Sequence, residues 1–286
     1  MSFTHPTRTT LAGLFGEALP LAAGRRGMKL GAESFFFTAV SAFLPIAMGF
    51  GEAGLISVFL VSASLGDRLS LLLEENRDNI YVAQTGPWVA NRRTAWSVLA
   101  LFLGILTGYA VIAWTLGEAG SSRFFGFAID AAGLREETLL ERDFGSPLGL
   151  LTNNALVLGT VFLLALVYRS YGAMLAIAWN ACVWAVVLTV LTESARGAVS
   201  GSAPVFFAAA AGAVLPHLTL EAFAYVLGSL AAIFTSKAIT TYALSDPILR
   251  EVLRVSAVLV AVSLAVLAMA AGVEALYTPW VLGQLG

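Results

Sequence analysis

Long apolar runs of about 20 residues, separated by short segments rich in charge or turn residues, dominate this sequence. An α-helix of that length crosses the hydrocarbon core of a bilayer. Four runs are clear, and none holds Asp, Glu, Lys or Arg before its last turn apart from Glu274: 95–117, 148–168, 172–192 and 255–275. The pattern therefore predicts four membrane-spanning helices at these positions.

A fifth apolar run, 204–234, is too long for a simple span. As a straight helix it would measure about 45 Å at ~1.5 Å per residue, against a hydrocarbon core of roughly 30 Å. Pro216 lies inside it, and proline lacks the amide hydrogen that a helix interior needs. We therefore expect this helix to break at Pro216.

The first apolar region, 35–65, is also long, and Gly51-Glu52-Ala53-Gly54 interrupts it. It is either one long tilted helix or a hairpin that enters and leaves by the same membrane face. Cytoplasmic loops carry an excess of Lys and Arg. One crossing would divide the 16 Lys and Arg residues equally, whereas a hairpin places three quarters of them on one side. The charges favour the hairpin, with the N-terminus inside and the C-terminus outside.

Composition supports the membrane class. The chain is 58% hydrophobic and only 12% charged, with a mean hydropathy of +0.84, far more apolar than a soluble domain. A net charge of −2 without a basic stripe makes nucleic acid an unsuitable partner. Because Cys182 is the single cysteine, an intrachain disulfide is excluded, and we interpret this residue as a small core residue. The sequence predicts an all-α polytopic membrane protein with no cofactor.

Two loops carry most of the remaining charge. Residues 67–94 mix charged residues with leucines, which indicates either an amphipathic helix along the inner membrane face or a solvated connector. The same charge count places the 118–147 segment on the outer side of the membrane, where it is expected to form short helices. These two segments are the surfaces we expect protein partners to contact.

His217 and Glu221 stand four residues apart inside the 204–234 run, so a helix would place them on one face. Ionisable groups at membrane depth mark a polar interior site by default. Asn153, Asn154 and Asn180 are further candidates, either joining helices or contacting a ligand. A zinc site normally needs three or four ligands, so a metal at His217 and Glu221 would require others. The pair is otherwise a proton or ion relay, or a buried lock that holds the helix.

These residues follow one another in a recognisable order: Asn153-Asn154, Tyr171-Gly172 with Asn180, Leu215-Pro216-His217 with Glu221, and Glu274 before Thr278-Pro279. In this order residues 95–286 resemble the stage II sporulation protein M family. Leu218 and Ala181 stand where that family often has glycine. The resemblance implies a five-span core with the N-terminus inside, in agreement with the charge count, and makes 35–65 an N-terminal addition.

The expected organisation is a cytoplasmic segment (1–32), a membrane hairpin or long tilted helix (33–66), an inner connector (67–94) and a five-span helical bundle (95–286) with its broken Pro/His helix. Family members in spore formers work with cell-wall-degrading partners during engulfment, so the resemblance implies a scaffold rather than a reaction. One hypothesis is thus a non-enzymatic scaffold of the cytoplasmic (inner) membrane. It would contact lipids, envelope proteins and further copies of itself. The other is a transporter or channel for an ion, a proton or a lipidic small molecule, with a cavity lined by His217, Glu221, Asn180 and Asn154.

Overall fold

The computed structural model describes residues 21–81, 83–84, 86–131, 146–195 and 203–283. Over these residues the chain is helical, without strands: α2 (Leu21–Ala47), α3 (Ala53–Tyr81), α4 (Pro87–Phe124), α5 (Gly126–Ala131), α6 (Pro147–Tyr168), α7 (Ser170–Ala195), α8 (Ala203–Thr241) and α9 (Pro247–Gly283). Within them, 7 helices are long and apolar enough to cross a membrane: α2, α3, α4, α6, α7, α8 and α9. The all-α fold is therefore confirmed over the described residues, and the seven long apolar helices are consistent with the predicted multi-pass membrane protein.

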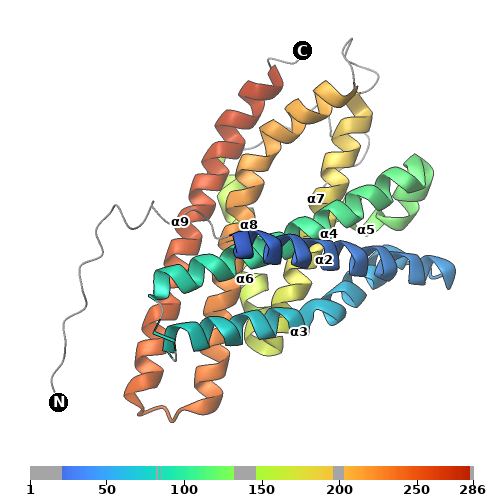
Figure 1. Cartoon of the computed structure of the whole chain (residues 1–286). Coiled ribbons are helices and arrows are strands. Elements are labelled where there is room, and N and C mark those ends of the chain that lie inside the picture. Colours follow the sequence, from blue (N-terminus) through green and yellow to red (C-terminus); the bar gives the residue numbers. More distant parts are fainter. Residues whose placement is uncertain (1–20, 82, 85, 132–145, 196–202, 284–286) are drawn as a thin grey trace.

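The helices form two sets that cross steeply. Figure 1 shows α2, α3 and α4 running across the view, while α8 and α9 run nearly vertically as a long hairpin. Helix α7 contacts α3, α4, α5, α6 and α8, and 72% of its apolar span is buried. Cys182 lies fully buried on this central helix, as the sequence predicted for a small core residue.

The 33–66 region belongs to two long helices. Helices α2 and α3 extend on either side of a short turn at residues 48–52, and α3 continues through 67–81. Leu69 and Leu73 on this second half are buried in the main core, and Leu72 packs with Leu30 and Leu101. The apolar stripe of the expected amphipathic segment thus faces the protein.

Helix α2 packs closely on α4 through small residues. A Cβ added at Gly104 would lie 2.2 Å from the carbonyl oxygen of Gly31 and 2.4 Å from Ser34 Oγ. Ser34 in turn donates to Leu30 O at 2.6 Å. Glycine at position 104 is therefore what allows the two backbones to approach.

The predicted span 95–117 ends at a kink. Gly117 has φ 65°, a left-handed conformation that glycine adopts without strain, and Ser121 Oγ donates to Ala113 O at 2.7 Å across the kink. The chain then continues as helix to Phe124 and, after a bend at Phe125, as α5 to Ala131, and Phe125 is buried against Tyr109. The expected short helices of the 118–147 segment are thus present up to Ala131. Residues 132–145 lie outside the described residues.

Helix α6 has sharply defined ends. Ser146 caps its start by accepting a hydrogen bond from Gly149 N at 3.1 Å, and Pro147 occupies the first turn. At the other end Arg169, with φ 53°, turns the chain directly into α7. A Cβ at Gly172 would lie 2.1 Å from Leu164 O, so α6 and α7 are packed tightly beside this turn.

The predicted break at Pro216 is wrong, since helix α8 runs as one element of 39 residues with Pro216 inside it. Figure 1 shows that α8 bends within its N-terminal half, the half to which Pro216 belongs, without interruption of the helix. One proline removes one backbone hydrogen bond, which neighbouring helices in a membrane bundle can compensate.

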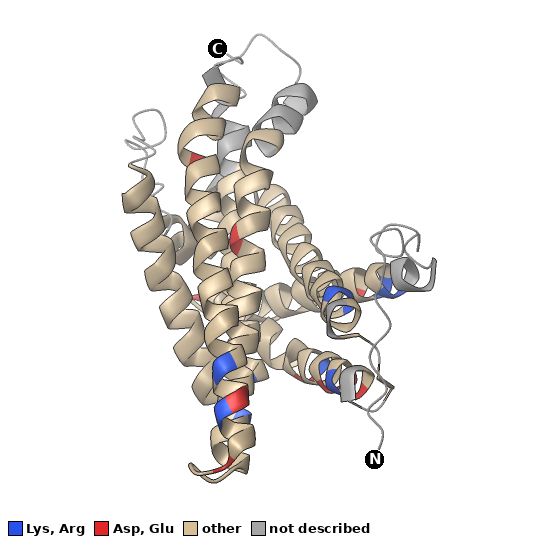
Figure 2. Cartoon of the chain, turned by 90° about the vertical axis from the view of Figure 1, so that its left-hand side faces the viewer, with Lys and Arg blue, Asp and Glu red and all other residues tan. Residues whose placement is uncertain are grey.

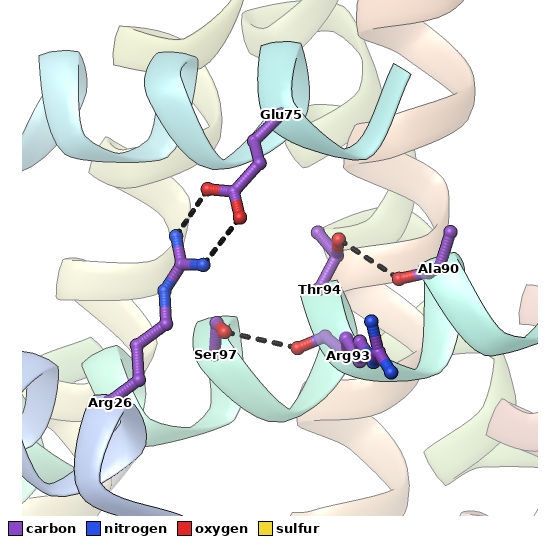
Figure 3. Close-up of polar contacts among 6 residues, drawn as sticks. All are labelled: Arg26, Glu75, Ala90, Arg93, Thr94 and Ser97. Atoms are coloured by element: carbon purple, nitrogen blue, oxygen red, sulfur yellow. Dashed lines mark hydrogen bonds and ion pairs between the residues drawn. The ribbon is translucent and has the colours of Figure 1, made fainter. Parts of the chain in front are cut away.

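Charged residues gather in two regions of the molecule. Figure 2 shows blue and red positions near the α8–α9 turn and along α2, α3 and α4, whereas the middle of the bundle is almost entirely tan. Figure 3 shows Arg26 on α2 donating from both terminal guanidinium nitrogens to Glu75 on α3, each at 2.5 Å. Thr94 and Ser97 in the same figure donate their hydroxyls to Ala90 O and Arg93 O, within their own helix. Hydroxyls bonded in this way can lie in an apolar environment at little cost.

Candidate functional site

His217 and Glu221 lie one turn apart on α8, as the spacing predicted, and both are buried, with 2% and 3% of their surfaces exposed. They face the interior between α6, α7 and α9. Polar groups so deeply enclosed must be bonded to other polar groups to be tolerated.

Glu221 is held by Asn154 of α6. The Asn154 Nδ2 amide donates to Glu221 Oε1 at 2.6 Å, and Asn154 is itself buried. The bond joins residues 67 positions apart in the chain and ties α6 to α8. It is the clearest interhelical polar contact of the site.

His217 is held from α9 and α7. Thr278 Oγ1 lies 3.1 Å from Ala213 O and 3.4 Å from His217 Nδ1. The threonine hydroxyl has one proton, so when it donates to Ala213 O, the ring Nδ1–H is the group that donates to the threonine oxygen. The Trp184 ring of α7 meets the imidazole edge-on, with centroids 5.6 Å apart.

Two further side chains complete the cluster. Glu274 lies one turn before Thr278 on α9 and is buried, as is Tyr225 one turn after Glu221 on α8. The Glu221 and Glu274 carboxyls act on each other electrostatically, and both act on the Tyr225 phenol. The buried polar cluster, as we call it below, consists of Asn154, His217, Glu221, Tyr225, Glu274 and Thr278.

Two predicted residues lie outside this cluster. Asn180 donates its side-chain amide to Ala176 O of its own helix at 2.8 Å. Asn153 is exposed on α6 and is bonded to none of the cluster residues. The adjacent asparagines therefore point in different directions, one into the bundle and one away from it.

Tyr225, Thr278 and Trp184 were not predicted as site residues. The first two follow Glu221 and Glu274 by four residues each, so the helical spacing that selected His217 and Glu221 also points to them. Trp184 carries no such signal, because its contact with His217 depends on how α7 packs against α8.

The cluster's chemistry is that of interhelical bonding around two carboxyl groups. Among the described residues no three His, Cys, Asp or Glu side chains form a group that could hold a metal ion. Comparison of the chain with family models, with curated proteins and with solved structures gave no match.

Proposed function

We propose that this chain is a non-enzymatic integral membrane scaffold that positions partner proteins in envelope or membrane remodelling. The proposal rests on the resemblance of residues 95–286 to the stage II sporulation protein M family and on one structural observation. That observation is the closed form of the buried polar cluster, in which bonds run from α6 and α9 to α8.

A closed cluster suits a scaffold because it fixes helices relative to one another. Each bonded pair joins residues more than 60 positions apart, and each partner is buried. In lipid, polar side chains of this kind join helices where the hydrophobic effect between them is weak. The cluster then acts through the fold and not through a reaction.

The scaffold proposal is tested by two substitutions at one position. Glu221→Gln keeps an oxygen that can accept the Asn154 hydrogen bond, whereas Glu221→Leu removes it. In the native host with the gene deleted, E221Q should restore envelope shape and division as the wild-type chain does. E221L should restore them only as far as the folded protein accumulates in the membrane. A folded, abundant E221Q chain that fails to complement would argue against the scaffold.

A second candidate is a transporter or channel for a proton or another small cation. The observation in its favour is that Glu221 and Glu274 are both buried and act on each other electrostatically. Carboxyl groups at membrane depth are costly and often belong to ion or proton pathways. Purified chain in liposomes loaded with a pH-sensitive dye tests this function. A proton flux above that of empty liposomes, abolished by E221Q in folded protein, would replace the scaffold with the transporter.

A further inference from the structure

One face of α6 is exposed along its whole length. Its residues repeat with alternating spacings of four and three, the repeat by which two helices pack along a common seam. Leu156 and Leu163 on this face are 68% and 61% exposed. The α6 seam, as we name it, consists of Gly149, Asn153, Leu156, Thr160, Leu163 and Val167.

Lipid alone is a poor cover for this face because of Asn153. Helix α6 has 22 residues, about 33 Å at ~1.5 Å per residue, which is only enough to cross the hydrocarbon core. Ser146 with Pro147 and the Arg169 turn mark the two ends of this helix, and Asn153 lies six residues, about 9 Å at ~1.5 Å per residue, inside its start. When this candidate span crosses the bilayer over its whole length, the exposed Asn153 amide faces acyl chains, where it has no water to bond.

Thr160, the other polar residue of the seam, needs no partner. Its hydroxyl donates to Leu156 O of its own helix at 3.0 Å. Gly149 and Gly159, on or beside the seam, leave the α6 backbone open to close approach, since a Cβ at Gly159 would meet nothing within 4 Å. The side-chain amide of Asn153 is thus the group on this face that needs a polar partner.

We propose that the α6 seam is the interface with a second copy of this chain, with the two Asn153 amides bonded to each other across the twofold axis. Two copies inserted in the same orientation present α6 in parallel, so each residue of the seam meets its own counterpart. An amide carries both donors and an acceptor, and each Asn153 can donate to the oxygen of the other. A single asparagine in such a seam fixes a two-stranded, in-register pair. This inference adds a partner to the scaffold proposal but does not depend on it.

The chain offers a clean crosslinking test, because its only cysteine, Cys182, is fully buried. In native membranes, L156C or L163C with a short thiol crosslinker should give a covalent dimer. V258C on α9, a helix without asparagine, is 57% exposed and serves as the control, which should give none. Absence of a dimer from both seam variants, or an equal dimer from V258C, would overturn the proposal.

Asn153 itself supplies the second test. N153L should weaken self-association of the full chain in detergent micelles roughly tenfold, as expected for loss of an interhelical amide pair in an apolar medium. N153Q should keep most of it. Both should stay folded, because the Asn153 side chain is exposed and has no hydrogen bond to another side chain among the described residues. An unchanged dimerisation constant for N153L would refute the amide pair, and this result is independent of whether E221Q complements in cells.

Discussion

The bond between Asn154 and Glu221 gives the sharpest energetic prediction of this structure. We consider a double-mutant cycle of N154L, E221L and the double variant, with E221Q as the conservative control. The donor–acceptor distance is 2.6 Å and both side chains are buried. Interhelical hydrogen bonds in membrane proteins average about 0.6 kcal/mol and reach about 1.7 kcal/mol. A short bond to a carboxyl group belongs near the upper end of that range.

We therefore expect a coupling energy of about 1–2 kcal/mol between positions 154 and 221. Each leucine substitution alone should lower the free energy of unfolding by about 2–3 kcal/mol, because it leaves the other polar group buried without its partner. The double variant should lose less than the two single variants together. E221Q should stay within about 1 kcal/mol of the wild type, since the amide oxygen still accepts the bond.

Cys182 provides the assay. It is the only cysteine and is fully buried on α7, so a thiol-reactive dye reports unfolding directly. The fraction labelled is followed as the detergent-held protein is titrated with denaturing detergent. Additivity of the two single variants within about 0.3 kcal/mol would show that the bond contributes nothing. An E221Q variant as unstable as E221L would equally refute the role given to the hydrogen bond.

Three further outcomes are expected. Gly104→Ala should destabilise the protein by about 1–3 kcal/mol because its Cβ meets Gly31 O at 2.2 Å, whereas Gly272→Ala, with nothing within 4 Å, should be neutral or stabilising in the same labelling assay. Thr278→Val should cost about 1 kcal/mol by removing the hydroxyl that bonds Ala213 O, and Thr278→Ser should restore most of it; equal loss in both would point to the methyl group instead. Arg26→Ala should cost at most about 1 kcal/mol, because the side chains of Arg26 and Glu75 are 46% and 48% exposed, and the effect should shrink as salt is added to the detergent solution.

The helical spans could be predicted because bilayer thickness dictates their length and composition. The apolar runs at 148–168 and 172–192 begin and end within a few residues of α6 and α7. The kink of α4 falls at Gly117, where the predicted span 95–117 ended. The helix break at Pro216 could not be judged in the same way, because a proline's effect depends on whether neighbouring helices support it.

The candidate site could be predicted only for residues that lie on one helix and are related by its four-residue spacing. The four-residue spacing placed His217 and Glu221 on one buried face, and Asn154, for which joining helices was one of the two roles left open, bonds Glu221 across α6 and α8. Sequence alone could not tell Asn154 from Asn153, since neighbours differ by about 100° around a helix and the direction of the core is set by packing. The Trp184 contact has the same origin, because it depends on the position of α7 against α8.

The steep crossing of the two helix sets has a consequence for the surrounding lipid. No single membrane normal can run along both α8–α9 and the α2, α3 and α4 set, so at least one set is strongly tilted (Figure 1). Apolar helices that lie flat cover less of the bilayer's depth than upright ones, and lipids adjust to such a mismatch by thinning or bending. The molecule therefore presents a hydrophobic girdle of uneven height, and vesicles containing it should depart from the uniform curvature of pure lipid.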